Sequence, residues 1–77
     1  MFTLYLTLYG QVVQPSTHES IDQLGKSLSK ALDDAEMSIH PRAMTLMLAL
    51  MFSDLRERRT WTWVGEDYEF FVARNDP

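Results

Sequence analysis

The sequence predicts an α+β domain in which two helices pack on one face of a small, mainly antiparallel, three-stranded sheet. Residues 2–9 and 60–64 alternate their side chains with the period of two that is typical of half-buried strands, and residues 68–73 read as a third strand after a turn. The part between the first two of these segments repeats its apolar residues with the period of a helix. The expected order is therefore β-α-α-β-β in a single domain, residues 1–77, of which residues 75–77 are expected to form a frayed tail.

The first strand is expected over residues 2–9, and a bulge at Gly10 would let it continue to Val13. It carries none of the charged side chains that protect an exposed sheet edge against unwanted pairing. We therefore expect something to cover this strand. Its apolar positions are Phe2, Leu4, Leu6 and Leu8, and the positions between them are Thr3, Tyr5, Thr7 and Tyr9.

The first helix is expected over roughly residues 17–36. Pro15 ends the alternation, and Ser16 with Glu19 has the spacing of a capping box, in which a hydroxyl and a carboxylate bind the free amides of the first turn. Gly25 lies at the edge of the apolar stripe and indicates either a close approach of another backbone or a tolerated imperfection. The stripe consists of Ile21, Leu24, Leu28, Ala31, Leu32 and Ala35.

The second helix is expected over about residues 41–57, because Pro41 after His40 suits the first turn of a helix. One stripe contains Met44, Met47, Leu48, Met51 and Leu55, and core packing is its default interpretation. The remaining circumference is also largely apolar, through Leu46, Ala49, Leu50 and Phe52. Such a helix needs cover on more than one side, from the sheet, from the other helix or from a second subunit.

A hairpin follows, with Trp61 and Trp63 on one face of its first strand and with residues 68–73 as its second strand. A loop with an even number of residues keeps Glu69 away from the core, and a two-residue type II′ turn at Gly65-Glu66 provides such a loop. The N-terminal strand can lie antiparallel beside the first hairpin strand or parallel beside the second. Both arrangements fit the sequence.

Length and composition predict association with a partner. A chain of 77 residues buries only about 60% of the surface exposed on unfolding, and its core contributes roughly 3–5 kcal/mol. Because the sequence has no cysteine, disulfides and thiolate zinc sites cannot add to this stability. A homodimer is therefore expected. The longest apolar run, Leu46 to Phe52, is far below the roughly 20 residues that cross a membrane, so we expect no membrane contact. The cysteine-free composition is compatible with the cytoplasm, which is the expected location.

The residues do not favour an enzyme. The chain has no thiol nucleophile, and its three glycines are isolated, so no phosphate-binding loop is indicated. His18 and His40 lack the spacing that places two imidazoles on one metal ion; we expect an early helical position for His18 and a cap neighbour in His40. We therefore predict no catalytic, cofactor-binding or metal-binding residues.

The preferred hypothesis is a non-enzymatic module that binds another protein. Tyr5, Tyr9 and Phe71 are expected on the sheet face away from the helices, among threonines, a composition typical of interfaces. The acidic residues that end the first helix, Asp33, Asp34 and Glu36, would steer a basic partner towards the molecule. In size, acidity and lack of motifs, the chain resembles small inhibitors that phages and other mobile elements encode against host machines. This resemblance rests on no particular residue.

The alternative is an accessory protein that binds nucleic acid through Arg56, Arg58 and Arg59 and the C-terminal hairpin. Arginines beside aromatic side chains can hold phosphates and stack on bases. Cations in the last turn of a helix are, however, commonly explained by the helix dipole. The net charge of −4 also opposes long-range attraction to nucleic acid.

Overall fold

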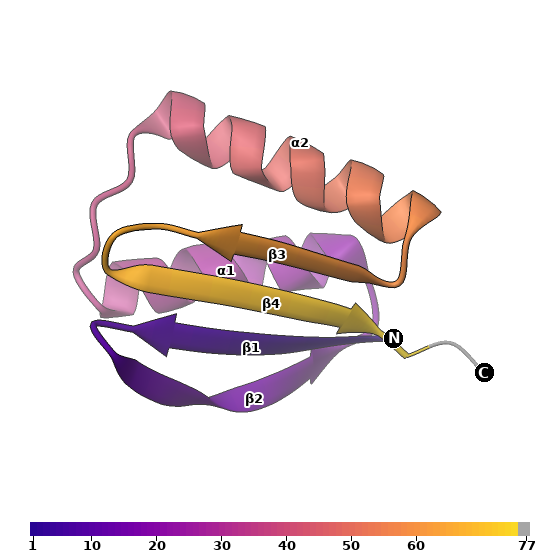
Figure 1. Ribbon diagram of the computed structural model, residues 1–77, viewed down its shortest axis with the longest axis horizontal. Helices are drawn as coiled ribbons and strands as arrows, with labels where there is room; N and C mark the ends of the chain where they lie inside the picture. The colour runs from indigo at the N-terminus through magenta and orange to yellow at the C-terminus, as the bar shows by residue number, and fades with distance from the viewer. Residues whose placement is uncertain (76–77) are drawn as a thin grey trace.

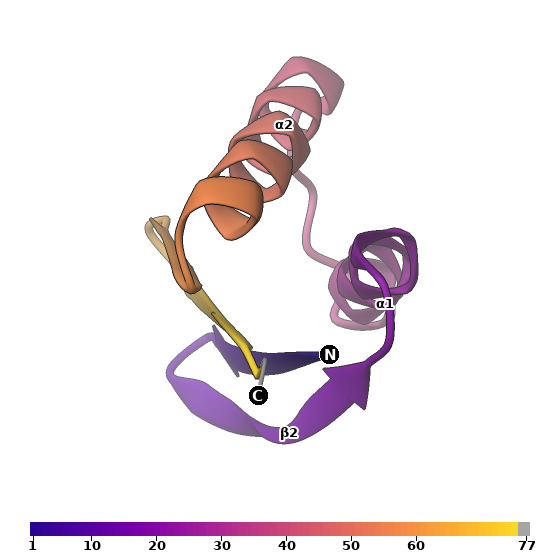
Figure 2. The ribbon, with the colours of Figure 1, turned by 90° about the vertical axis from the view of Figure 1, so that its right-hand side faces the viewer.

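The computed structural model describes residues 1–75 as two helices packed on one face of a four-stranded antiparallel sheet (Figures 1 and 2). The α+β class is confirmed, but the sheet has four strands where three were expected. The strand order is β2-β1-β4-β3. The elements are β1 (Phe2–Leu8), β2 (Gln11–His18), α1 (Ile21–Asp34), α2 (Pro41–Glu57), β3 (Thr60–Val64) and β4 (Tyr68–Arg74).

The additional strand is β2, which forms a hairpin with β1. Tyr9 and Gly10 both have positive φ angles, of 51° and 76°, and they connect the paired residues Leu8 and Gln11. Two consecutive positive φ angles are the geometry of the type I′ turn, whose twist suits a two-residue hairpin. The expected extension of the first strand through a bulge at Gly10 is therefore wrong, since the chain reverses there.

The start of α1 also differs from the expected one. Ser20, not Ser16, caps the helix, because its hydroxyl accepts a hydrogen bond from the Gln23 amide at 3.2 Å. The Gln23 side-chain oxygen in turn accepts from the Glu19 amide at 3.2 Å. The same capping spacing thus occurs four residues later than expected, and His18 ends β2 where a helical position was expected.

β1 lies in the centre of the sheet, hydrogen-bonded to β2 on one edge and to β4 on the other. The cover expected for this strand comes from the same chain, because β2 and β4 occupy its two edges. Both strand arrangements considered from the sequence are wrong, since β1 lies beside the last strand and antiparallel to it. The β1–β2 hairpin adds one chain reversal before the helices, and this reversal changes the direction of every later strand relative to β1.

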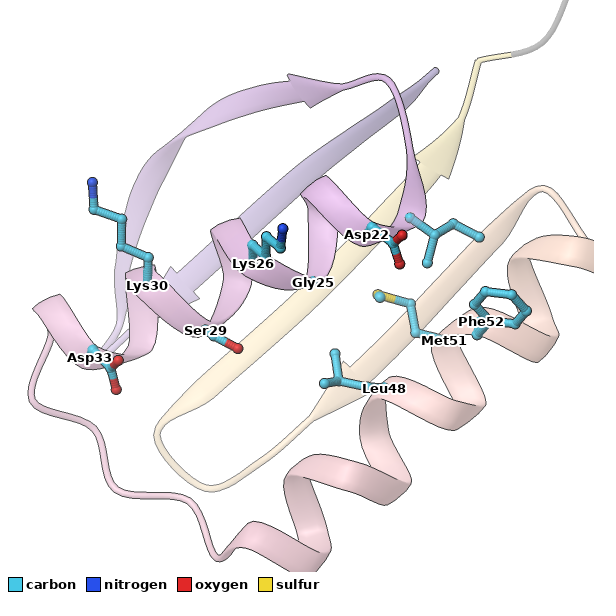
Figure 3. Close-up of a pocket in the computed structure, with 10 residues that line it drawn as sticks. Asp22, Gly25, Lys26, Ser29, Lys30, Asp33, Leu48, Met51 and Phe52 are labelled. Atoms are coloured by element: carbon cyan, nitrogen blue, oxygen red, sulfur yellow. The ribbon is translucent and has the colours of Figure 1, made fainter.

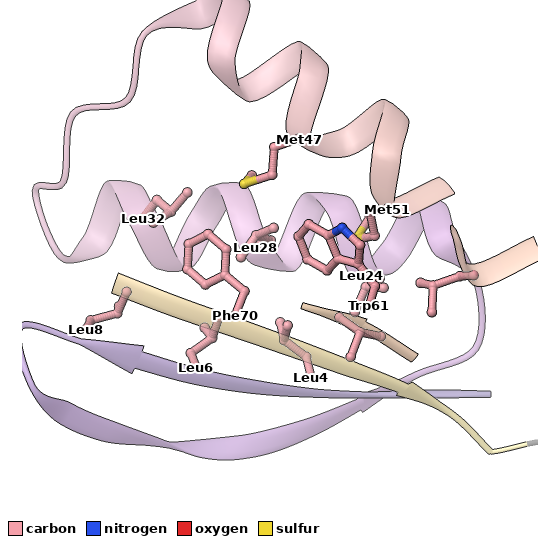
Figure 4. Close-up of a cluster of buried hydrophobic side chains, with 12 residues drawn as sticks. Leu4, Leu6, Leu8, Leu24, Leu28, Leu32, Met47, Met51, Trp61 and Phe70 are labelled. Atoms are coloured by element: carbon pink, nitrogen blue, oxygen red, sulfur yellow. The ribbon is translucent and has the colours of Figure 1, made fainter. Parts of the chain in front are cut away.

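The core lies between the sheet and the helices, in a single cluster of buried apolar side chains (Figure 4). α1 packs over β1 and β2, whereas α2 packs over β3. The methionine stripe of α2 faces this core as expected, since Met47 and Met51 are buried. The buried residues are Leu4, Leu6, Leu8, Leu24, Leu28, Leu32, Met47, Met51, Leu55, Trp61, Phe70 and Val72.

α2 begins and ends where the sequence predicts. Pro41 occupies its first turn, and the Nδ1 atom of His40 accepts a hydrogen bond from the Arg42 amide at 3.1 Å, which caps the helix. At its other end, the Arg74 guanidinium donates from Nη1 to the carbonyl oxygen of Leu55 at 2.7 Å. β4 thus supplies a cation to the negative end of the α2 dipole.

The β3–β4 hairpin has the predicted faces, since Trp61 lies opposite Val72 and Glu69 lies off the core face, but its register differs by two residues from that of a Gly65-Glu66 turn. The turn lies one residue later than expected, at Glu66-Asp67, because the Gly65 amide donates to the carbonyl oxygen of Tyr68 at 2.8 Å. Gly65 is needed for a different reason: a Cβ atom there would collide with the Tyr68 ring.

Asn75 falls within the segment expected to fray. Its backbone amide donates to the carbonyl oxygen of Met1 at 2.8 Å, and its side-chain amide donates to the Thr3 hydroxyl. This contact brings the beginning of β1 close to the end of β4. The rest of the expected tail, residues 76–77, lies outside the described residues.

Candidate functional site

The outer face of the sheet, away from both helices, is the candidate functional site. Cross-strand partners share a face, so the pairing of the four strands defines which side chains it carries. Both helices lie on the opposite side, and no described element covers the outer face (Figure 2). Its strand positions are Thr3, Tyr5, Thr7, Val12, Thr17, Thr60, Thr62, Val64, Glu69, Phe71 and Ala73.

Tyr5 and Phe71 form the centre of this face. They are direct cross-strand partners on the two central strands, and their ring centroids lie 5.7 Å apart with the planes inclined by 49°. Their exposed fractions are 43% for Tyr5 and 37% for Phe71. Packing against one another restricts both rings, so a partner would meet an aromatic pair that is already ordered.

The surroundings of the pair are polar but almost uncharged. Thr62 lies beside Phe71 on the next strand, and further threonines follow in the neighbouring rows. Among the strand positions that the structure describes on this face, Glu69 is the single charged side chain. Rings surrounded by hydroxyl groups and few charges match the composition of interface cores.

Tyr9, expected on the outer face with Tyr5 and Phe71, lies in a turn at one end of the sheet. It belongs to the β1–β2 turn, where its amide donates to the carbonyl oxygen of Asp67 at 2.8 Å. Its side chain is exposed, so it can extend the outer face at that end. The structure thus brings Tyr5 and Phe71 together and places Tyr9 at the rim.

The acidic residues lie apart from the aromatic pair. Asp33 and Asp34 end α1, and Glu36 follows in the connection to α2, so all three belong to the helical layer. They are exposed, as expected for solvated carboxylates. They share an end of the molecule with the β3–β4 turn, which adds Glu66 and Asp67. This end is therefore acidic but contributes no side chain to the centre of the outer face.

The arginines occupy the opposite end. Arg56 lies over the Phe52 ring, with its guanidinium carbon 5.6 Å from the ring centroid, and Arg58 is the C-cap residue of α2. Arg59 precedes β3, and its carbonyl oxygen accepts from the Arg74 amide at 2.7 Å. All three side chains are exposed, but they border the outer face without lying on it.

A groove of about 630 Å³ lies between α1 and α2 on the helical side (Figure 3). Leu48, Met51 and Phe52 project into it from α2, and Gly25 with Ser29 forms part of the α1 wall. Gly25 does not mark a close backbone approach, because a Cβ atom there would make only an ordinary contact with Leu48 at 3.8 Å. The charged residues that line the groove are two aspartates and two lysines, so the groove does not favour a ligand of either charge. These residues are Asp22, Lys26, Lys30 and Asp33.

The histidines have local structural roles. His40 caps α2, and the Nε2 atom of His18 lies 2.8 Å from the Ser16 hydroxyl oxygen. Among residues 1–75, no three histidine, aspartate or glutamate side chains are grouped so that they could hold a metal ion. Within the same residues, neither helix combines the length and the apolar character needed to span a membrane.

The sequence periodicity located the aromatic pair, since it assigned Tyr5 and Phe71 to one face of two strands. It missed Val12 and Thr17, which extend this face on β2. Val12 and Val13 could have indicated this strand, because they are adjacent β-branched residues, which favour strands, and they follow Gly10 closely. No family model, curated protein or solved structure matches the chain.

Proposed function

We propose that this protein is a non-enzymatic interaction module that binds another protein through the outer face of its sheet. The observation that carries this proposal is the uncovered Tyr5–Phe71 pair on the two central strands, with Glu69 as the single charged strand position on the described face. Aromatic side chains at the centre of a contact typically contribute most of its binding energy. Acid–base catalysis would require a convergent polar site, whereas this face presents hydroxyl groups and rings.

The specialised form of the proposal is a small cytoplasmic inhibitor that occupies a functional surface of a host macromolecular machine. The acidic end, with Asp33, Asp34 and Glu36, would accelerate approach to a basic surface without forming the central contact. Such a protein needs one well-ordered face and no chemistry of its own. The antiparallel sheet provides this face because both of its central strands are hydrogen-bonded on each side.

Site-specific photo-crosslinking tests the proposal. A photoreactive phenylalanine analogue replaces Phe71 in one variant and Lys30, an exposed residue of α1, in a control variant. We expect the variant at position 71 to form defined crosslinks to protein in cell lysate, and we expect the Tyr5→Ser substitution in the same chain to weaken them. Equal crosslinking from positions 71 and 30 would contradict the proposal.

Binding of nucleic acid is the alternative, because exposed rings on central strands can stack on unpaired bases. The position of the arginines favours protein, since Arg56, Arg58 and Arg59 border the face without lying beside the Tyr5–Phe71 pair. The same crosslinking experiment separates the two partners. Crosslinks at position 71 that disappear after nuclease treatment would assign the face to nucleic acid.

A further inference from the structure

The two edges of the sheet differ in how well they are protected. β2 contains Pro15, and its pairing with β1 is irregular between Leu4 and Leu6, so its open edge is interrupted. Prolines and bulges of this kind prevent a second chain from extending a sheet. β3 forms the other edge with the sequence Thr-Trp-Thr-Trp-Val, which has no proline and no charge, and its pairing with β4 is regular.

The free backbone groups of β3 can be assigned from its hydrogen bonds to β4. The Arg59 carbonyl oxygen accepts from Arg74, and the Gly65 amide donates to Tyr68, so the odd-numbered residues of this strand face β4. Backbone groups alternate in direction along a strand. Thr60, Thr62 and Val64 therefore direct their amides and carbonyl oxygens towards the open edge.

The residues next to β3 carry opposite charges at its two ends. Arg58 and Arg59 precede the strand, whereas Glu66 and Asp67 follow it, and all four side chains are exposed. An antiparallel copy of β3 would place the arginines of each chain beside the carboxylates of the other. A parallel copy would place like charges together, so the charge pattern selects the antiparallel arrangement.

α2, which packs over β3, also exposes apolar side chains. Leu46 and Leu50 each lie about 200° around the helix from Leu48, which lines the groove facing α1. They therefore occupy the side of α2 that faces away from α1, and α2 is the helix that packs over β3 (Figure 2). Their exposed fractions are 55% and 41%, which is high for leucines on a packed helix.

We infer that this edge binds a second copy of the chain. In the proposed dimer the two β3 strands pair antiparallel about Thr62, which forms one continuous eight-stranded sheet. Thr60 of each chain then lies opposite Val64 of the other, and the two α2 helices lie side by side with Leu46 and Leu50 between them. The dimer leaves both outer faces free, so the inference does not depend on the function proposed for that face.

Sedimentation velocity of the pure protein tests the dimer. Two five-residue strands and two pairs of leucines form a small interface, so we expect a dimer dissociation constant in the micromolar range. Sedimentation is therefore measured at protein concentrations up to roughly 200 µM. The mass is expected to rise from the 9.0 kDa of the monomer to twice that value. Thr62→Lys should abolish this rise, because two lysines would meet at the centre of the pairing, whereas Thr17→Lys on the other edge should not.

Charge reversal tests the register. We expect the variant Arg58→Glu with Arg59→Glu and the variant Glu66→Arg with Asp67→Arg each to remain monomeric, since like charges then meet at both ends. An equimolar mixture of the two variants should form a heterodimer, because every contact becomes complementary again. This recovery also shows that both variants are folded.

Crosslinking tests the position of the two-fold axis. The chain has no cysteine, so Thr62→Cys introduces a single thiol at the predicted axis, and a short bismaleimide should join two chains there. Thr17→Cys is the matched control. The inference is overturned by a monomer at all concentrations, by equal crosslinking at positions 62 and 17, or by a mixture of the charge variants that stays monomeric.

Discussion

The two faces of the sheet use adjacent residues of the same strands for different purposes. In β4, Phe70 is fully buried beneath the helices, whereas Phe71 keeps 37% of its surface exposed on the other side. The inner face is apolar and covered, and the outer face combines rings with hydroxyl groups and has no covering element among the described residues. The comparison shows that folding uses one side of this sheet and leaves the other available for contact.

The strongest test of this comparison removes one aromatic ring from each face of the sheet. Phe70→Ala removes a ring from the centre of the core and is expected to cost about 3–5 kcal/mol, which would unfold a domain of this size. Phe71→Ala removes a ring that is partly in water and is expected to cost about 1 kcal/mol through its contact with Tyr5. Urea unfolding followed by circular dichroism measures both, and equal losses would contradict the division between the faces.

The covered face is tested next at the β3–β4 turn, where Tyr68 packs against the core. Gly65→Ala places a methyl group where the Tyr68 ring lies, and we expect a loss of about 1–3 kcal/mol because the ring must move. Gly25→Ala is the matched control in α1, where space exists, and it should stabilise the protein by up to about 1 kcal/mol. Thermal unfolding measures the stability of both variants. A Gly65→Ala variant as stable as the unmodified protein would show that the Tyr68 ring is not fixed against Gly65.

A smaller effect is expected where β4 binds α2. Arg74→Met removes the hydrogen bond to the Leu55 carbonyl oxygen and a cation from the helix end, at an expected cost of about 1–2 kcal/mol. Arg58→Gln, at an exposed position nearby, should change stability by less than about 0.5 kcal/mol. Chemical denaturation of the two variants is the measurement. Similar losses would mean that Arg74 acts only through general surface charge.

The smallest effect tests the beginning of the helical layer. Ser20→Ala removes the observed cap of α1 and is expected to cost about 1 kcal/mol. Ser16→Ala removes only a contact with His18 in the edge strand, so we expect a change within about 0.5 kcal/mol. The denaturant midpoints of the two variants show which serine stabilises the fold more. A larger loss for Ser16→Ala would place the start of the helix at the position expected from the sequence.

Periodicity predicted most of this fold because most elements are covered on one side. β1, β3, β4 and α1 each bury one face, so their side chains repeat with the period of their backbone. β2 lies at an edge and exposes almost every residue, so it has no such alternation, and Pro15 imitates the end of a strand. The capping sequence occurs twice, at Ser16 and at Ser20, and composition does not distinguish the two.

The missing strand also explains the error in topology. One undetected reversal at Tyr9-Gly10 inverts β1 relative to all later elements, so neither proposed neighbour of β1 had the correct direction. The assignment of Tyr5 and Phe71 to the outer face is correct despite this error, because the face of a residue depends on alternation within its strand and not on strand order. The location of the charged residues relative to Tyr5 and Phe71 depends on strand order and helix placement, so it could be determined only from the structure.

The neighbouring position of β1 and β4 has a consequence for biosynthesis. β1 and β4 pair at the middle of the sheet although four other elements separate them in the chain, so this pairing cannot form until β4 has been synthesised. Until then the nascent N-terminal hairpin displays three leucines and an unsatisfied backbone edge to the cell. A truncated product that lacks the last strand would keep that edge permanently and become a substrate for chaperones and proteases.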